Sequence, residues 1–282
     1  MNNKVIDGKF LAAELRKSLV SRIASLPSRP VLAVILVGHN PASEIYVRNK
    51  EKAAKEVGIE CRILRFEENV SQQKLEETIF RLNEDLFVNG IIIQQPLPAH
   101  LNTSEIVALV RSDKDVDGFS PVNLGLLQTN NPRAIAAATP KGIMFMLHSV
   151  LPDLSGKNAV VIGRSNIVGK PLASLLLNAD CTVTLTHSKT KNLPDVVRRG
   201  DIVVAACGCP KLVKKDWLKE GAVVIDVGIN RDADGKLCGD VDFNDALEVA
   251  SFISPVPGGV GPMTVVMLLE NTLQAYLRQN NV

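Results

Sequence analysis

The sequence lacks three features that would assign it to a special class of protein. No uninterrupted apolar run approaches the length of a membrane helix, so no membrane partner is expected. A net charge of only +2 gives no strong bias toward nucleic acid. The five cysteines are scattered, and no second pair or histidine stands at zinc-finger spacing from Cys207 and Cys209, which argues against a structural zinc site.

The cysteines and the N-terminal stretch also indicate a compartment. Most cysteines stand within apolar runs such as IVVAACGC, which favours buried, reduced thiols. The stretch MNNKVIDGKFLAAELRK carries acidic residues early and has no apolar core of the kind found in signal peptides. We therefore expect a cytoplasmic protein.

The length and the hydrophobic pattern predict two α/β domains. A chain of 282 residues is about right for two domains of ordinary size. Short apolar, β-branched runs alternate with helical patterns in both halves, which predicts parallel sheets with crossover helices. The second half is expected to form a Rossmann-like, doubly wound sheet. Strands are expected at 31–38, 60–66, 90–98, 158–163, 181–188, 201–208 and 222–230, with helices at 43–58 and 71–85 and after Pro171 and Pro262.

The candidate boundary between the domains is NLGLLQTNNPRAIAAATPKG, which is rich in Asn, Pro and Thr. The last helix could pack back across the first domain. The predicted division is 1–120 plus 268–282 for one domain and 121–267 for the other.

The stretch AVVIGRSNIVGKP resembles a phosphate-binding P-loop but departs from it twice. Five residues separate Gly163 from Gly169 where the P-loop has four, and Pro171 follows Lys170 where a Ser or Thr would ligate magnesium. Nucleoside triphosphate hydrolysis is therefore not expected. A strand, a glycine turn and a helix remain, which either bind a dinucleotide or only connect two elements.

The next strand favours NADP over NAD as the dinucleotide. NAD sites of this kind usually end the second strand with an acid that binds the ribose 2′-hydroxyl. Here the strand ends in THSK with no carboxylate, while Arg164, Ser188 and Lys189 could surround a 2′-phosphate. A solvated loop charge is the alternative interpretation of Lys189 and Lys191.

Two features of the first half are candidates for chemistry. Tyr46 and Lys50 stand four residues apart on one helix face, where a partly desolvated lysine could handle protons. An ordinary helix surface is the competing interpretation. Gln94 and Gln95 interrupt an otherwise apolar strand, which predicts an amide that faces a ligand.

The segment Asp113-Lys114-Asp115-Val116-Asp117-Gly118 matches only the opening of a calcium-binding EF-hand loop. Leu124 stands where that loop needs a bidentate Glu, so calcium is not expected and no metal is predicted. Turn and capping chemistry accounts for Asp113 and Asp115. Asp117 is then available for another role.

The run PVPGGVGP brings three glycines to the start of the last helix. Such a loop lets the backbone approach a ligand closely, although a stiff linker would have the same composition.

Eight stretches in order resemble one family. The stretches VGHNPASEIYVRNKEKA, IIIQQPLP, DKDVDGFSPVN, TPKG, VVIGRSNIVGKP, THSKT, VIDVGIN and PVPGGVGPMT are similar to the bifunctional methylenetetrahydrofolate dehydrogenase and methenyltetrahydrofolate cyclohydrolase family. The resemblance implies NADP-dependent oxidation of methylenetetrahydrofolate, hydrolysis of the methenyl product to formyltetrahydrofolate, and a homodimer. Residues 1–120 and 268–282 would bind folate, and 121–267 would bind NADP.

The resemblance also implies site residues. Lys50 would be the main catalytic residue of the hydrolysis, supported by Gln94. Tyr46 would pack against the folate ring system, and Asp117 would bind the amino edge of the pterin ring. The cofactor would contact Gly163, Arg164, Ser165, Ser188, Ile229 and Thr264. The folate would contact Tyr46, Val47, Arg48, Asn49, Lys50, Ile93, Gln94, Gln95, Asp117, Pro257, Gly258, Gly259, Val260 and Gly261.

Two departures and two alternatives accompany this interpretation. Ala138 stands where many members have cysteine, and Gln95 stands where leucine is common; neither replaces a residue with a catalytic role. Another two-domain NADP dehydrogenase, with a shikimate-like substrate, is one alternative. A folate- or dinucleotide-binding protein without turnover is the other.

Overall fold

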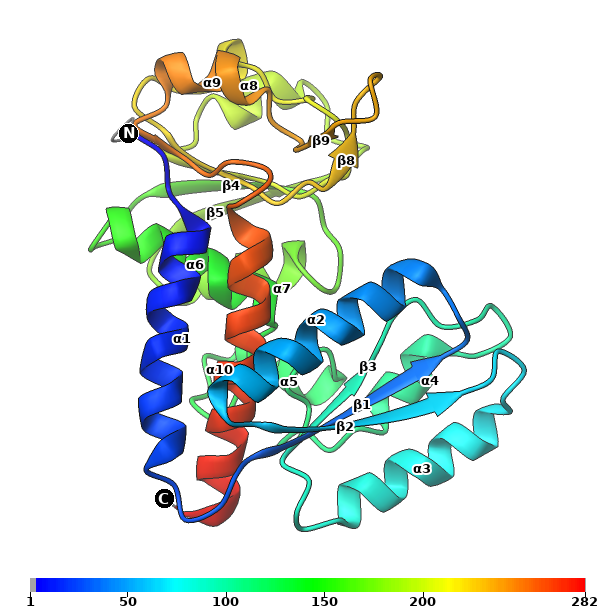
Figure 1. The fold of residues 1–282 in the computed structure, drawn as a ribbon. Helices are drawn as coiled ribbons and strands as arrows, with labels where there is room; N and C mark the ends of the chain where they lie inside the picture. The colour runs from blue at the N-terminus through cyan, green and yellow to red at the C-terminus, as the bar shows by residue number, and fades with distance from the viewer. Residues whose placement is uncertain (1–3, 282) are drawn as a thin grey trace. The chain divides into compact units, whose positions relative to one another are not determined.

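The computed structural model describes residues 4–281, which form two compact units (Figure 1). The three-stranded unit comprises residues 14–138 and 265–281, and the five-stranded unit comprises residues 4–13 and 139–264. Helices α1 (Gly8–Ala24) and α10 (Val260–Asn280) contribute residues to both ranges.

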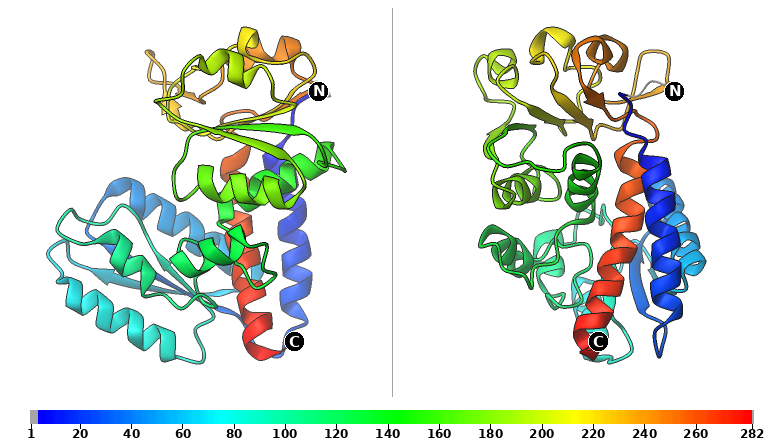
Figure 2. Two further views of the ribbon diagram at one scale, coloured as in Figure 1. Left: turned by 180° about the vertical axis from the view of Figure 1, so that it is seen from behind. Right: turned by 90° about the vertical axis from the view of Figure 1, so that its left-hand side faces the viewer.

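The three-stranded unit is a parallel sheet in the order β2-β1-β3 with helices on both faces. Helix α2 lies on one face and α3 on the other, as two further views confirm (Figures 1 and 2). The elements confined to this unit are β1 (Val31–Val37), α2 (Pro41–Val57), β2 (Glu60–Phe66), α3 (Gln72–Glu84), β3 (Gly90–Ile93), α4 (Thr103–Ala108) and α5 (Pro121–Gln128).

The central strand explains why this sheet is covered on both sides. Every residue of β1 is buried, which is the pattern of a strand packed on both faces. The alternate residues Val31, Ala33, Ile35 and Val37 share one core cluster with apolar side chains from α3, β3 and the segment around α4. The remaining positions of the strand face the opposite layer.

The five-stranded unit is a parallel sheet in the order β10-β7-β6-β4-β5, with α8 and α9 on one face and α6 and α7 on the other (Figure 1). A short antiparallel pair, β8-β9, accompanies it. The elements of this unit are α6 (Ala138–Val150), whose first residue belongs to the other unit, β4 (Asn158–Ile162), α7 (Gly169–Asn178), β5 (Thr182–Thr186), α8 (Leu193–Val197), β6 (Ile202–Ala205), η1 (Lys215–Trp217), β7 (Val223–Asp226), β8 (Asn230–Arg231), β9 (Leu237–Cys238), α9 (Phe243–Val249) and β10 (Phe252–Ile253).

The strand order of this sheet fixes where a ligand would bind. From β4 the chain first adds β5 on one side and then β6, β7 and β10 on the other, so the order reverses between β4 and β6. In open parallel sheets, ligands bind beyond the carboxyl ends of the strands at such a reversal. The stretch Gly163-Arg164-Ser165 follows β4 at this point.

The predicted fold class is confirmed, and several element boundaries differ, as three examples show. Strand β3 ends at Ile93, so Gln94 and Gln95 follow the strand rather than interrupt it. Strand β7 ends at Asp226, well before the expected 230. The helix expected after Pro171 begins at Gly169, because the proline occupies its first turn, where no backbone N–H is needed.

The compact units do not coincide with the predicted division of the chain. Residues 121–138 group with the three-stranded unit, where the side-chain amide of Asn123 donates to the Ser112 carbonyl oxygen at 2.9 Å. Residues 4–13 group with the five-stranded unit, where the Ile6 N–H donates to the Ile253 carbonyl oxygen at 2.9 Å. The division at 120 and 267 stays a prediction about folding domains.

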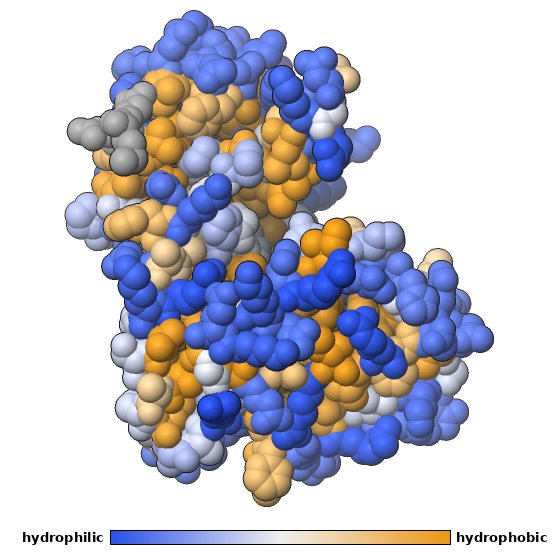
Figure 3. All heavy atoms as spheres, viewed as in Figure 1, coloured by the Kyte–Doolittle hydropathy of each residue, from blue (hydrophilic) through white to orange (hydrophobic). Residues whose placement is uncertain are grey.

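The surface alternates between polar and apolar patches on the face drawn in Figure 3. Among the helices of residues 4–281, none has the length and apolar character needed to cross a membrane.

Candidate active site

Helix α2 presents the first group of candidate residues, and its ends are well defined. The side chain of Asn40 caps the helix by accepting from the N–H groups of Ala42 at 3.0 Å and Ser43 at 3.1 Å. Gly58 ends it in the left-handed conformation, with φ of 91°. Tyr46 and Lys50 therefore lie one turn apart on the same side of a regular helix.

Lys50 and Gln94 meet across the carboxyl end of the three-stranded sheet. The Lys50 ammonium donates to Gln94 Oε1 at 3.1 Å. Gln94 is buried, and its own amide nitrogen donates to the Gln95 carbonyl oxygen at 2.7 Å. Its backbone N–H donates to the Ile35 carbonyl oxygen at 2.9 Å, so the side chain that holds Lys50 is itself held at both ends.

The neighbours of this pair differ in exposure. Tyr46 is 49% exposed and offers an aromatic face, and Arg48 and Asn49 are exposed beside it. Val47 has no exposed surface, and Ile93 belongs to the core cluster. The predicted ligand contacts of these five residues stay predictions.

Asp117 lies in a loop of the same unit, and its carboxyl is electrostatically coupled to Lys50. Burial raises the pKa of Asp117 to about 6, the Lys50 charge opposes that rise, and the Asp115 carboxylate adds to it. A carboxylate and an ammonium therefore act on one another in this unit, although they are far apart in sequence.

The Asp115 carboxylate shapes the backbone on which Asp117 stands. It accepts from the N–H groups of Gly118 at 3.0 Å, Phe119 at 3.2 Å and Ser120 at 2.8 Å, so the turn chemistry expected of Asp115 is confirmed. Gly118 has φ of 70°, and a Cβ there would lie 2.6 Å from the Ile135 carbonyl oxygen. Only glycine fits at this point of the loop.

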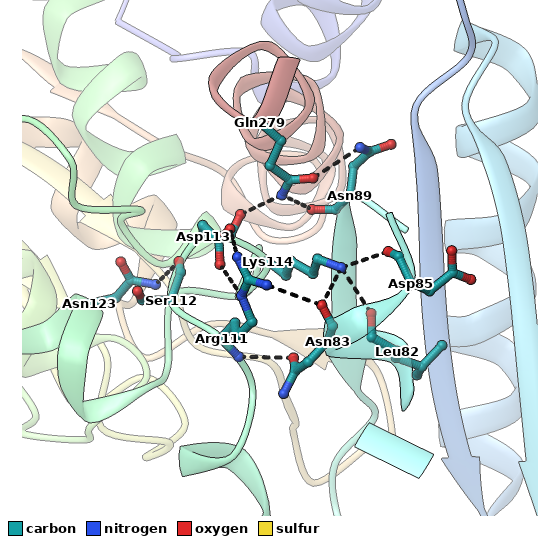
Figure 4. A network of polar contacts seen from close by, with 10 residues as sticks. All are labelled: Leu82, Asn83, Asp85, Asn89, Arg111, Ser112, Asp113, Lys114, Asn123 and Gln279. Atoms are coloured by element: carbon teal, nitrogen blue, oxygen red, sulfur yellow. Dashed lines mark hydrogen bonds and ion pairs between the residues drawn. The ribbon is translucent and has the colours of Figure 1, made fainter. Parts of the chain in front are cut away.

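Lys114, the residue between Asp113 and Asp115, anchors this loop from the other side (Figure 4). It is buried, and its ammonium donates to the carbonyl oxygens of Leu82, Asn83 and Asp85 at 3.0, 2.7 and 2.7 Å, at the end of α3. Burial lowers the pKa of Lys114. Its charge is used to bind backbone oxygens at the end of α3.

In the five-stranded unit, the glycine loop lines a cavity of about 330 Å³ at the reversal of the strand order. Gly163 has φ of 118°, and a Cβ there would overlap the Ala206 carbonyl oxygen. Ser165 Oγ accepts from the N–H groups of Val168 at 3.1 Å and Gly169 at 3.3 Å, and so holds the turn that leads into α7. Four of the predicted cofactor residues line this one cavity: Gly163, Arg164, Ser165 and Ser188.

A second cavity of the five-stranded unit, of about 180 Å³, is lined by all but one of the other predicted site residues of this unit. Its lining includes Ile229 and all five residues from Pro257 to Gly261. Thr264 lines neither of the two cavities; its hydroxyl lies 2.9 Å from that of Thr139. Its predicted contact with the cofactor stays a prediction.

Two family models match the chain in sequence order. Residues 6–117 match the tetrahydrofolate dehydrogenase/cyclohydrolase catalytic domain, and residues 137–280 match the NAD(P)-binding domain of the same family. The chain belongs to the tetrahydrofolate dehydrogenase/cyclohydrolase family. The resemblance seen in the sequence is thereby confirmed.

Relatives and solved structures agree over nearly the whole chain. A bifunctional protein FolD of Streptococcus agalactiae is 52% identical over 279 residues, which cover 98% of each chain. A FolD dehydrogenase/cyclohydrolase structure from Campylobacter jejuni is 46% identical with a TM-score of 0.95 and 99% of both chains covered. A Trypanosoma brucei structure, solved with NADP and an inhibitor, is 40% identical with a TM-score of 0.92, covering 99% of this chain and 98% of that one.

Sequence reasoning missed several residues that line the two cavities of this family member. His187, Cys207, Cys209 and Leu212 line the larger cavity, and Lys9 lines the smaller one. His187 Nδ1 accepts from the Lys189 N–H at 3.1 Å, which leaves Nε2 as the other hydrogen-bonding atom of the ring. Its position at the end of the second strand could have indicated it.

The two cysteines of the larger cavity differ from the expected buried thiols. Cys209 is exposed and Cys207 is half-buried, so only part of that expectation holds. Burial, followed by the nearby Asp240 carboxylate, raises the pKa of Cys207 to about 12. Cys207 therefore remains a neutral thiol at neutral pH.

Proposed function

We propose that this protein oxidises methylenetetrahydrofolate with NADP and hydrolyses the methenyl product to formyltetrahydrofolate. The observation that carries the hydrolytic half is the bond of 3.1 Å between Lys50 Nζ and Gln94 Oε1. Membership of a dehydrogenase/cyclohydrolase family supports both halves.

Hydrolysis requires a proton to be moved as water attacks the methenyl carbon. Lys50 is the group that handles this proton, at Nζ. Gln94 fixes the ammonium through its buried amide, and Asp117 accepts from the amino edge of the pterin ring. Tyr46 offers its exposed ring to the folate as a stacking surface.

Oxidation requires orientation more than it requires an acid or a base. The carbon that loses the hydride is flanked by two nitrogens, which stabilise the cation that forms. When bound, NADP supplies the hydride acceptor. The close backbone approach between Gly163 and Ala206 leaves the cavity wall free of side-chain bulk at that point, which fits a dinucleotide held against main chain.

Selection of NADP is assigned to Arg164 and Ser188. Both line the larger cavity, and no carboxylate is among the residues described as lining it. A guanidinium and a hydroxyl suit a 2′-phosphate, whereas a 2′-hydroxyl would call for an acid. Lys189 and Lys191 are exposed loop residues and are not assigned a contact.

The test is an absorbance assay of the purified protein with methylenetetrahydrofolate and NADP, repeated with NAD. We expect methenyl and NADPH signals, with a much weaker response to NAD. Decay of added methenyltetrahydrofolate measures the hydrolytic half separately. Absence of both signals with NADP would sink the dehydrogenase proposal.

We also propose a homodimer in the cytoplasm, with residues 1–120 and 268–282 as the folate domain and 121–267 as the NADP domain. The edge strand β5 supports a dimer, because its first four residues alternate between exposed and half-buried and Leu177 on neighbouring α7 is 52% exposed. Light scattering should give the mass of two chains, and a monomer at micromolar concentration would refute the dimer. Cell fractionation tests the compartment.

A further inference from the structure

Asp240 is a fully buried acid in the five-stranded unit, just after β9. Its side chain has no exposed surface, and it forms no ion pair with any residue in the range 4–281. A buried carboxylate without a cationic partner is costly unless hydrogen-bond donors surround it. The contacts of Asp240 therefore indicate what its charge is used for.

The donors to Asp240 come from two separate segments. Oδ2 accepts from the backbone N–H groups of Cys207 at 2.7 Å and Gly208 at 3.0 Å, just beyond β6. Oδ1 accepts from the side-chain amide of Asn230 at 2.8 Å, in the first residue of β8. One carboxylate thus ties together two chain segments that are more than twenty residues apart in sequence.

A second buried acid, Asp226, fixes Asp240 in turn. Asp226 Oδ1 accepts from the backbone N–H groups of Gly228 at 2.9 Å and Asp240 at 2.9 Å. Its Oδ2 accepts from the Val241 N–H at 2.9 Å. The two carboxylates therefore form a hydrogen-bonded relay. Asp226, at the end of β7, binds the backbone of Asp240 after β9, and Asp240 in turn binds the backbone that follows β6.

The packing around the relay leaves no room for adjustment. A Cβ at Gly228 would overlap the backbone nitrogen and carboxylate of Asp240, and a Cβ at Gly239 would overlap the carboxylate of Asp226. The two glycines allow the backbone to close around the acids. Neither segment can shift without breaking a charge-assisted hydrogen bond.

The segments that the relay holds are walls of the two cavities. Residues 206 and 207 line the cavity of about 330 Å³ together with Gly163 and Arg164. Residues 226–229 line the cavity of about 180 Å³. Asp240 itself is not among the residues lining either cavity. It holds the backbone of Cys207 in the wall of the larger cavity, and Asp226 holds the backbone of Gly228 in the wall of the smaller one.

We propose that Asp240 is a positioning residue for the cofactor, acting through the backbone of Cys207 and Gly208 and through Asn230. This inference rests on the proposed NADP-dependent function. Neutralising Asp240 would loosen the wall of the cofactor cavity without removing a group that touches the cofactor. The hydrolytic residues Lys50, Gln94 and Asp117 belong to the other unit and would keep their contacts.

The test is Asp240→Asn, in which one oxygen becomes an NH₂ group that cannot accept from the N–H groups it would face or from Asn230. We expect the dissociation constant and the KM for NADP to rise about tenfold, as expected for loss of a hydrogen bond to a charged group. Hydrolysis of methenyltetrahydrofolate without cofactor should keep its kcat/KM within about twofold. Calorimetric titration with NADP measures the binding directly.

The matched control is Asp245→Asn in the same unit. Asp245 also accepts a backbone N–H, from Lys215 at 2.8 Å, but its side chain is 29% exposed and it is not among the residues lining either cavity. This variant should bind NADP like the wild type. Asn230→Ala, which removes one donor and keeps the acid, should weaken NADP binding in the same direction and less.

Each outcome decides the proposal. Unchanged NADP affinity in both Asp240→Asn and Asn230→Ala would overturn it, as would an equal loss of hydrolysis and NADP binding in both variants. If Asp240→Asn does not fold, the effect of Asn230→Ala on NADP affinity decides. A wild-type protein that neither binds nor reduces NADP would instead refute the proposed function.

Discussion

The two units present their candidate sites in different chemical terms. In the three-stranded unit the groups that carry the site are side chains, since Lys50, Gln94 and Asp117 offer an ammonium, an amide and a carboxyl. In the five-stranded unit glycine lines both cavities, and Gly163 and Gly228 stand where a Cβ would not fit. The first arrangement suits proton handling, and the second suits close binding of a large ligand.

Both units nevertheless build their loops in the same way. A buried carboxylate collects backbone N–H groups and forces a turn into one shape: Asp115 does this beside Asp117, and Asp226 with Asp240 does it beside the cofactor cavity. The difference between the sites therefore lies in what the loop carries. One loop carries a side chain proposed to bind the substrate, and the other places the Cys207 backbone at a cavity wall.

The largest expected effect comes from removing the side-chain chemistry. Lys50→Ala should lower the rate of methenyltetrahydrofolate hydrolysis by roughly 10²–10⁴-fold, because no other amine is held by Gln94, while part of the dehydrogenase activity survives. Stopped-flow absorbance of methenyl decay measures it. Lys52→Ala, on the exposed side of the same helix, is the control and should hydrolyse normally. Normal hydrolysis in Lys50→Ala would refute the assigned role and with it the contrast between the units.

The next effect concerns the loop that carries Asp117. Asp115→Asn should raise the KM for folate substrates roughly 30-fold in both reactions, because an amide cannot satisfy all the N–H groups that the carboxylate now holds. Steady-state kinetics of each reaction measure it. Asp113→Asn removes only an exposed ion pair with Arg111 and should change KM by less than about twofold. A change in NADP affinity without a change in folate KM would contradict this prediction.

A smaller effect should separate the two dinucleotides. Arg164→Gln should raise the KM for NADP roughly tenfold and leave that for NAD unchanged, because only NADP offers a phosphate to the guanidinium. Initial rates at varied cofactor concentration measure both values. Lys170→Gln is the control, since its ammonium is bound to Asn166 at 2.7 Å. An equal rise in KM for NADP and NAD would mean that Arg164 does not bind the 2′-phosphate.

The sequence predicted the fold class and the family because both depend on local patterns. Apolar runs such as 31–37 and 158–162 became strands of parallel sheets, and eight motifs in fixed order were enough to indicate the family. Strand ends were less predictable. The apolar run at 90–98 ends as a strand at Ile93: the Gln94 N–H still donates to the Ile35 carbonyl oxygen, but a proline without an N–H follows Gln95.

The separate roles of the loop carboxylates could not be assigned from the sequence. Asp113, Asp115 and Asp117 alternate in one short stretch, and only the fold shows that Asp115 binds the backbone and Asp113 pairs with Arg111. Asp240 stands two residues before a second aspartate, Asp242, in GDVDF. Its partners Cys207 and Asn230 are distant in sequence, so their convergence depends on strand order rather than on any motif.

The smallest expected effect is a dependence of the free energy of unfolding on pH. One acid from each unit contributes to it, Asp117 and Asp226. Burial raises the pKa of Asp117 and of Asp226 to about 6 each, from 3.8. Between these values the folded protein binds more protons than the unfolded chain, so these groups make the protein more stable at pH 4 than at pH 7, and that contribution is lost as pH rises through about 6. Asp117→Asn should therefore gain free energy of unfolding relative to wild type on going from pH 5 to pH 7, by about 1 kcal/mol once solvent screening of the partly exposed carboxyl is allowed for. Urea unfolding at both pH values measures the difference, with Asp113→Asn as the control. If the stability of Asp117→Asn relative to wild type is the same at pH 5 and pH 7, the Asp117 carboxyl is solvated and its pKa is not raised by burial. Asp117 would then no longer distinguish the site of the three-stranded unit electrostatically.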